Sequence, residues 1–230
     1  MTQDAVFAGG EGDQWFERNR QALARKDTPE HDPVLRVLQL ANLQPRRVIE
    51  IGASNGFRLN LLQQLRPCDV TAVDVSEAAI VEGRARYPGV TFLQGAASAV
   101  PIAEDGGFDL VMVNAVLHWI DRSTLMRSCA ELDRLLAPHG FLIIGDFHPA
   151  APERVNYHHR SDVELYTYKQ NYAEIFLASR LYTQFASVVY DHDTWACNPD
   201  VAPRDRYQVV VLKKTGDEAY ITRAFPADKT

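Results

Sequence analysis

Short, nearly continuous apolar segments rich in Val and Ile alternate with longer segments of helical spacing between residues 47 and 147. Apolar runs of about 4–8 residues are typical of strands that are covered on both faces of a sheet. The pattern predicts five such strands, at 47–52, 70–75, 90–95, 108–114 and 140–147. It predicts helices at 57–66, 76–87 and 122–136, and Pro138 is expected to end the last of them.

Strands that alternate with helices imply crossover connections and a parallel sheet. Two further strands are expected at 187–191 and 207–213, and the short Pro-containing segment between them leaves no room for a helix, so this pair is predicted to be antiparallel. Helical stretches at 13–26 and 33–41 precede the sheet. The fold class is therefore α/β, a doubly wound and mostly parallel sheet of seven strands with helices on both faces.

The chain of 230 residues is expected to form a single domain. Residues 150–180 lie between the fifth and sixth predicted strands, and we expect them to be partly helical. The expected parts are N-terminal cap helices at 1–45, a cofactor-binding core at 46–147, an insertion or lid near the acceptor site at 148–185, the last two strands at 186–214 and a polar tail at 215–230.

Composition narrows the classes of function. A hydrophobic fraction of 46% supports one sizeable core, and a net charge of −6 argues against the basic surface that binds nucleic acid. No window holds the ~20 apolar residues of a membrane span, and residues 1–12 lack a signal-peptide pattern. Cys68, Cys129 and Cys197 are far apart and form no Cys-x-x-Cys motif, so we expect no disulfide framework, no zinc site and a cytoplasmic location.

The strongest motif is VIEIGASNG at 48–56, a strand followed by a loop of small residues and then a helix. Small residues let a ligand approach the backbone, and the helix start offers free N–H groups to a carboxylate or phosphate. Asp74 ends the next strand, 22 residues after Gly52. An acid at about this spacing reaches the ribose hydroxyls in nucleotide sites.

The order of these pieces resembles the class I family of S-adenosylmethionine-dependent methyltransferases, whose sheet is seven-stranded and Rossmann-like. The resemblance covers about residues 46–147, through the motifs at 48–56, 73–80, 107–120 and 132–147. It implies the strand order 3-2-1-4-5-7-6 with strand 7 antiparallel, and S-adenosyl-L-methionine as the cofactor. The residues it places at this cofactor are Glu50, Gly52, Ala53, Ser54, Gly56, Asp74, Val75, Gly95, Ala96, Ala97, Asn114 and Ala115.

Three positions depart from the family pattern. Ser54 stands where a glycine is common, and Ala96 stands where many members have an acid that contacts adenine, which leaves recognition to backbone groups and Ser98. His139 replaces a glycine in the turn before the fifth strand and is expected to adopt a positive φ.

The acceptor is expected beyond the carboxyl ends of the strands. His118 is the first candidate for a general base, His148 the second, and a structural histidine is the alternative for each. The predicted acceptor-binding residues are Trp119, which follows the fourth strand, and Tyr157, His158 and Tyr168 of segment 155–172. The Tyr, His and Lys side chains of this segment favour a lid over a polar or anionic acceptor, and the alternative is a solvated helix. No metal site is predicted, because the histidines have no established ligand spacing.

The N-terminal segment 11–19 resembles the lead-in of some bacterial methyltransferases of surface-sugar pathways, in which Trp15, Phe16 and Arg18 would cover the cofactor. The alternative is an amphipathic helix that packs on the sheet. The leading hypothesis is a methyltransferase for a small polar metabolite, such as a sugar or a secondary product, acting at O, N or C. An RNA or protein methyltransferase, or a module that binds NAD(P) or another nucleotide without turnover, are the alternatives. The oligomeric state is left open, with a homodimer as one option.

Overall fold

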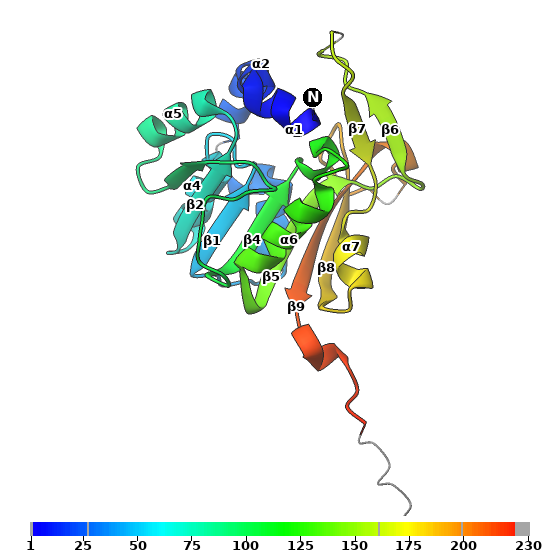
Figure 1. Ribbon diagram of the computed structural model, residues 1–230. Helices are drawn as coiled ribbons and strands as arrows, with labels where there is room; N and C mark the ends of the chain where they lie inside the picture. The colour runs from blue at the N-terminus through cyan, green and yellow to red at the C-terminus, as the bar shows by residue number, and fades with distance from the viewer. Residues whose placement is uncertain (1, 27, 161, 199, 224–230) are drawn as a thin grey trace, which may run out of the picture.

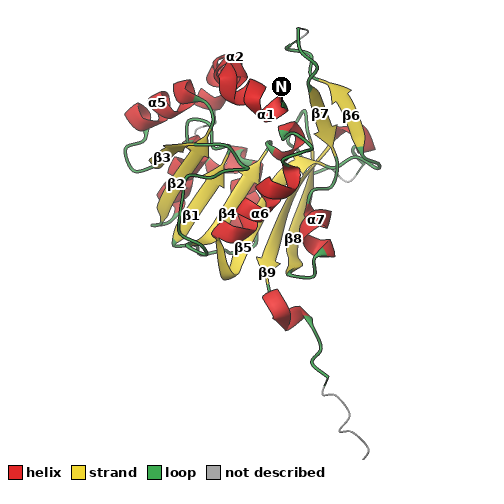
Figure 2. Ribbon diagram, in the orientation of Figure 1, coloured by secondary structure: helices red, strands yellow, loops and turns green. Residues whose placement is uncertain are grey.

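The computed structural model describes residues 2–26, 28–160, 162–198 and 200–223. Its main sheet has seven strands in the order β3-β2-β1-β4-β5-β9-β8, with helices on both faces (Figures 1 and 2). This order confirms the predicted fold class and topology, since β8 and β9 are the sixth and seventh strands of this sheet along the chain. The first five strands pair in parallel, and β9 runs antiparallel to both β5 and β8.

The strands follow the apolar segments of the sequence closely. They are β1 Arg47–Ile51, β2 Asp69–Asp74, β3 Thr91–Gln94, β4 Phe108–Asn114, β5 Leu136–Phe147, β6 Glu153–Asn156, β7 Tyr166–Lys169, β8 Tyr182–Asp191 and β9 Arg206–Lys214. The α-helices are α1 Gln3–Val6, α2 Gly12–Ala24, α3 Pro33–Leu40, α4 Phe57–Leu65, α5 Glu77–Arg86, α6 Leu125–Leu135 and α7 Ala173–Ala178. Between α1 and α2 lies one π-helical stretch, η1 Phe7–Glu11, and the short 3-10 turn η3 Leu117–Trp119 follows β4.

The alternation of side chains along each strand divides the core into two layers. On β1, Val48 packs with α3, α4 and α5 on one face, whereas Ile49 and Ile51 pack with α6 on the other. All three side chains are at most 1% exposed. Burial on both faces explains why these strands have nearly continuous apolar sequences.

The turn between α6 and β5 differs in part from the prediction. The helix ends at Leu135, and Pro138 lies within β5 rather than at the end of the helix. His139 has a φ of 63°, as expected from its place in a turn that usually holds glycine. At the other side of the sheet, β8 begins at Tyr182 and therefore takes in residues assigned to the insertion.

Residues 150–180 are partly helical, as predicted, and they also contain two short strands that were not predicted. Strands β6 and β7 form a separate antiparallel pair, and among the described residues of this segment α7 is the one α-helix. Each of the two strands has only four residues, and their side chains are exposed or half-buried. So short a strand, without an apolar run, gives almost no periodic signal in the sequence.

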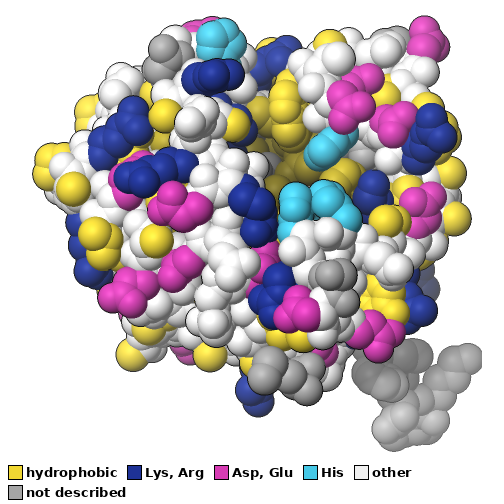
Figure 3. Space-filling model, turned by 90° about the horizontal axis from the view of Figure 1, so that it is seen from above, with side chains coloured by type: hydrophobic (Ala, Val, Ile, Leu, Met, Phe, Trp, Pro, Cys, Tyr) yellow, Lys and Arg dark blue, Asp and Glu magenta, His cyan; other side chains and the backbone are white. Residues whose placement is uncertain are grey.

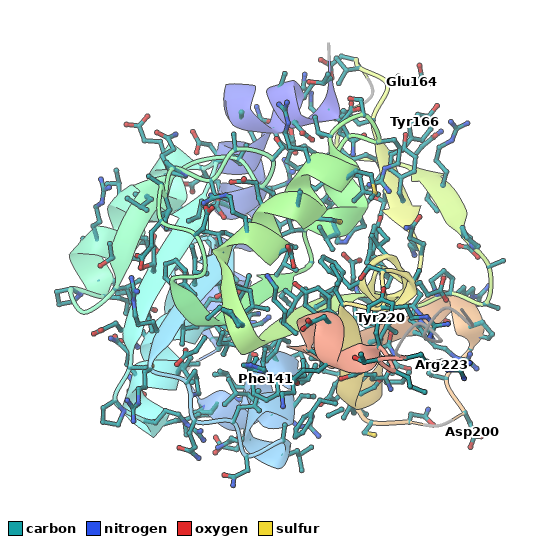
Figure 4. The ribbon with its side chains drawn as sticks, turned by 60° about the horizontal axis from the view of Figure 1, so that its bottom comes forward. Phe141, Glu164, Tyr166, Asp200, Tyr220 and Arg223 are labelled. Atoms are coloured by element: carbon teal, nitrogen blue, oxygen red, sulfur yellow. The ribbon has the colours of Figure 1, made fainter. Side chains whose placement is uncertain are left out.

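The N-terminal helices and the β6–β7 pair lie at the same end of the molecule, above the carboxyl ends of the parallel strands (Figure 1). Glu164 and Tyr166 are at this end, whereas Phe141 and Tyr220 lie toward the opposite end (Figure 4). Of the expected polar tail, residues 224–230 lie outside the described residues. No helix of the described residues is long and apolar enough to cross a bilayer, and all three cysteines are free of disulfides.

Candidate cofactor and acceptor site

A cavity of about 550 Å³ opens at the carboxyl ends of β1, β2, β4 and β5. This is the edge of an open α/β sheet where ligands bind, and the volume lies within the range of small-molecule sites, about 300–1,000 Å³. Seen from above, histidine side chains stand beside a hollow that shows hydrophobic side chains within it (Figure 3). The cavity therefore has the place and the size of a small-ligand site.

The loop after β1 forms one wall of the cavity through Gly52, Ala53 and Ser54. Gly52 has a φ of 72°, and a Cβ atom there would lie 2.1 Å from Cγ2 of Val116. A larger residue would thus be strained and would also clash. Ser54 is left-handed as well, with a φ of 52°, and its buried Oγ has no hydrogen-bond partner among the described residues.

Asp74 closes the adjacent wall at the end of β2. One carboxylate oxygen accepts the backbone N–H of Ser54 at 2.7 Å, and the other accepts that of Ser76 at 2.8 Å. A carboxylate offers about four lone-pair sites, so about two are left for a ligand. Burial raises the pKa of Asp74, while its bonds from Ser76 and Ser54 oppose the increase.

The third and fourth strands complete this half of the cavity. Gly95, Ala96 and Ala97 line it after β3, and Asn114 and Ala115 line it after β4. The Asn114 Oδ1 atom accepts the hydroxyl of Tyr207 at 3.0 Å, and Ala115 has a φ of 56°. These residues surround a space beside Asp74 that is bounded largely by backbone and small side chains.

At the other half of the cavity, His118 forms a buried pair with Asp146. Its Nδ1 lies 2.7 Å from Oδ1 of Asp146, and its backbone N–H donates to Oδ2 at 3.3 Å. The ring is 2% exposed in total and lies between Trp119 and Phe147, with ring centroids 4.4 and 5.0 Å away. A carboxylate at Nδ1 assigns the proton to that nitrogen and leaves Nε2 as an acceptor.

The N-terminal segment forms a roof that is tied to the β6–β7 pair. The side-chain amide of Gln3 donates to the carbonyls of Trp119 at 2.7 Å and Tyr166 at 2.8 Å. Glu11 is fully buried, and its carboxylate accepts the Tyr157 hydroxyl at 2.7 Å. These contacts link segments more than 100 positions apart in the chain across the top of the cavity.

Comparison with known proteins shows similarity to methyltransferases. Residues 49–144 match the family model described as "Methyltransferase domain". A malonyl-[acyl-carrier protein] O-methyltransferase of Halorhodospira halophila is 33% identical over 123 residues, which are 51% of this chain and 40% of that protein. A trans-aconitate 2-methyltransferase of Acidovorax is 32% identical over 126 residues, which are 54% of this chain and 47% of that protein. This chain spans less than half the length of these curated relatives.

Among solved structures, a 1,6-didemethyltoxoflavin-N1-methyltransferase of Burkholderia thailandensis, with 1,6-didemethyltoxoflavin and S-adenosylhomocysteine bound, aligns with a TM-score of 0.67. The alignment covers 94% of this chain and 91% of that one at 16% identity, so the likeness concerns the fold. Residues 49–144 thus belong to a methyltransferase domain, and the fold is that of class I S-adenosylmethionine-dependent methyltransferases.

Most of the residues predicted for the site of this methyltransferase domain line the cavity. Nine of the twelve predicted cofactor-site residues are discussed above, and Val75 lines it too. So do His118 and three predicted acceptor residues, Trp119, Tyr157 and His158. Trp15, proposed to cover the cofactor, also lines the cavity, whereas Phe16 packs in the core and Arg18 binds Glu11 and Tyr157.

Four predicted site residues do not line the cavity. Gly56 is the residue before α4 and has a φ of 74°. Tyr168 points away because strand side chains alternate, so that its neighbours Thr167 and Lys169 face the cavity instead. His148 donates its backbone N–H to Arg206, and burial together with the nearby Arg206 charge lowers its pKa. Glu50 is the fourth.

Glu50 belongs to a buried ion cluster behind the cavity. Its carboxylate binds the guanidinium of Arg58, which also binds both oxygens of Asp32 at 3.0 and 2.9 Å. Asp32 in turn caps α3 through the backbone N–H groups of Val34 and Leu35. Glu50 thus anchors α4 and α3 to β1. The acid of the first motif therefore makes a structural contact in this chain and does not line the cavity.

Several cavity residues were missed by the sequence interpretation. Asp146, which holds His118 from behind the cavity wall, was not among the predicted site residues, although its position near the end of β5 is a usable signal. Phe147 lines the cavity from the end of the motif at 132–147, whereas Lys169, His192 and Trp195 line it from segments with no motif. Among the described residues, no cluster of three or more potential metal ligands is present.

Proposed function

We propose that this protein is a methyltransferase that uses S-adenosyl-L-methionine to methylate a small molecule. The observation that carries the proposal is the continuity of one cavity from Asp74 at the end of β2 to the His118–Asp146 pair at the end of β5. One end has groups suited to a nucleoside, and the other has a buried imidazole that can accept a proton.

The residues present fit the cofactor. Asp74 would accept hydrogen bonds from the ribose hydroxyls with its remaining lone pairs. The Ser54 hydroxyl, buried and without a described partner, is an orphan that a polar ligand group would satisfy. Gly95 to Ala97 would lie along the adenine, and Asn114 and Ala115 beside the sulfonium. When bound, S-adenosylmethionine supplies an electrophilic methyl group.

His118 would act as the general base for an acceptor that carries a hydroxyl, carboxyl or ring N–H. The acceptor atom forms a bond to the methyl carbon while the carbon–sulfur bond breaks and sulfur keeps the electron pair. The proton of the acceptor passes to Nε2 of His118. Asp146 holds the imidazole at Nδ1 and stabilises the imidazolium that results, because a buried carboxylate favours the charged ring.

The known relatives support a small-molecule acceptor, since their names include malonyl-[acyl-carrier protein] and trans-aconitate as acceptors. The net charge of −6 argues against RNA. Incubation with radiolabelled S-adenosylmethionine and either total RNA or a fraction of small metabolites separates these classes. We expect label in the metabolite fraction, and label only in RNA would contradict the proposal.

The base is tested by His118→Gln and Asp146→Asn. Loss of a positioned base lowers turnover by about 10²–10⁴-fold. Asp146→Asn should also lower turnover, because the imidazolium loses its counter-charge and the ring loses the carboxylate that holds Nδ1. Affinity for S-adenosylhomocysteine should stay within about twofold of wild type. Full turnover in His118→Gln would make the histidine structural and leave positioning as the source of the acceleration.

A further inference from the structure

The acceptor half of the cavity contains an ammonium group for which no function has been given. Lys169 ends β7, lines the cavity and is half-buried. Its Nζ lies 4.2 Å from the centroid of the Phe147 ring, against which His118 also packs. The Phe147 ring therefore lies against both the ammonium of Lys169 and the imidazole of His118, which would take the proton of the acceptor.

No carboxylate of the described residues forms an ion pair with Lys169. Glu153 lies opposite it in the β6–β7 register, yet its side chain is exposed and makes no such pair. The acids that line the cavity are Asp74, on the nucleoside side, and Asp4. Asp4 already accepts from the Asp121 backbone N–H and the Thr124 hydroxyl. A half-buried cation without a counter-ion favours an anion in the space before it.

The acceptor half of the cavity has flat aromatic rings in its walls. Phe7 and Trp119 lie stacked, with centroids 5.5 Å apart and planes 25° from parallel, and both line the cavity. Phe147 supplies a third face, beside His118. Trp119 is held in place by a hydrogen bond from its Nε1–H to the Thr167 hydroxyl at 3.1 Å. Rings fixed in this way favour stacking with another ring over contact with a flexible chain.

The whole cavity, for cofactor and acceptor together, has a volume of about 550 Å³. Because the cofactor must share this volume, the acceptor is limited to a small molecule. We propose that the acceptor is a small, flat aromatic compound with one anionic group, which Lys169 binds while the aromatic walls hold the ring and direct it to His118. This inference rests on the proposed function and adds the class of its substrate.

Three matched probes test the proposal by calorimetry on the full chain saturated with S-adenosylhomocysteine. They are 4-hydroxybenzoate, which is flat and anionic, 4-hydroxybenzamide, which is flat and neutral, and 4-hydroxycyclohexanecarboxylate, which is anionic and not flat. We expect 4-hydroxybenzoate to bind at least about tenfold more tightly than either of the others. Equal affinity of acid and amide, or of the aromatic and the alicyclic acid, would overturn the proposal, and so would no binding of any probe at millimolar concentration.

The matched variants are Lys169→Met and Arg154→Met. Arg154 also lies over an aromatic ring of the same strand pair, 4.3 Å from the Tyr166 centroid, but it does not line the cavity. Lys169→Met should weaken 4-hydroxybenzoate about tenfold and leave the amide unchanged, Lys169→Arg should keep most of the affinity, and Arg154→Met should change neither probe. An unchanged acid affinity in Lys169→Met would refute the role of the ammonium.

Binding of S-adenosylhomocysteine is measured first in the same instrument. A protein that binds it but does not discriminate among the probes contradicts only the acceptor class. A protein that does not bind it contradicts the proposed function, and the three probes titrated into the free protein still test the preference for a flat anion.

Discussion

Replacement of Asp74 by Ala tests the nucleoside end of the cavity most sharply. The two carboxylate oxygens accept backbone N–H groups at 2.7 and 2.8 Å, which leaves about two lone pairs for the ribose. A hydrogen bond to a charged acceptor contributes about 1.5–3 kcal/mol in folded proteins. Because water replaces part of this in the variant, we expect a net loss of about 1–3 kcal/mol, or a Kd for S-adenosylhomocysteine that rises about 5–150-fold.

The same substitution also leaves the backbone N–H groups of Ser54 and Ser76 without an acceptor, so stability must be controlled. Asp109 provides a matched control, because its carboxylate accepts the N–H groups of Arg46 and Arg47 at 2.8 and 3.0 Å, and it does not line the cavity. Asp109→Ala should lower the melting temperature and leave the Kd unchanged. Calorimetry is done at a temperature at which the variant is fully folded. If it then gives a wild-type Kd for Asp74→Ala, Asp74 does not hold the ribose and the reasoning fails.

Two further predictions concern the loop and the buried ion cluster. Gly52→Ala should weaken the binding of S-adenosylhomocysteine, because the new Cβ would lie 2.1 Å from Cγ2 of Val116. The Cβ of Val116 is 3.4 Å away, so Val116→Ala removes the clash and should restore part of the affinity. If calorimetry shows no recovery in the double variant, the clash is not the cause. Burial raises the pKa of Glu50 to about 7 from 4.5, against the opposing charge of Arg58. Between pH 4.5 and about 7, Glu50 therefore binds more protons in the folded protein than in the unfolded chain. The contribution of Glu50 to the stability of wild type thus falls as the pH rises through this interval. Gln does not ionise, so the melting temperature of Glu50→Gln should rise relative to that of wild type over this pH interval. A difference in melting temperature that stays constant with pH would contradict the assignment.

The sequence was sufficient to predict the sheet and the residues that line the Asp74 end of the cavity. Buried strands such as β1 carry continuous apolar runs, and the turn at Gly52 and the acid at Asp74 are fixed by local backbone needs that leave a mark in the sequence. His118 was found in the same way, because it follows a strand end. Each of these features depends on residues close to one another in the chain.

The acceptor end could be predicted only in part, because it is built by contacts between distant segments. Lys169 faces the cavity only because residues 166–169 form a strand, and the tyrosines around it suggested a helix or a lid instead. Register decides whether Tyr168 or its neighbours point inward, and a strand of four residues without an apolar run does not reveal its register. The roof likewise depends on Gln3 and Glu11 contacting residues over 100 positions away.

The most direct test of the account is a calorimetric titration of the unmodified protein with S-adenosylmethionine, S-adenosylhomocysteine and NAD. A cavity with one carboxylate for the ribose and a small-residue loop beside it should bind the first two compounds, one molecule per chain, and NAD far more weakly. Binding of NAD in preference to both, or no binding of either sulfur compound, would contradict the assignment of this cavity.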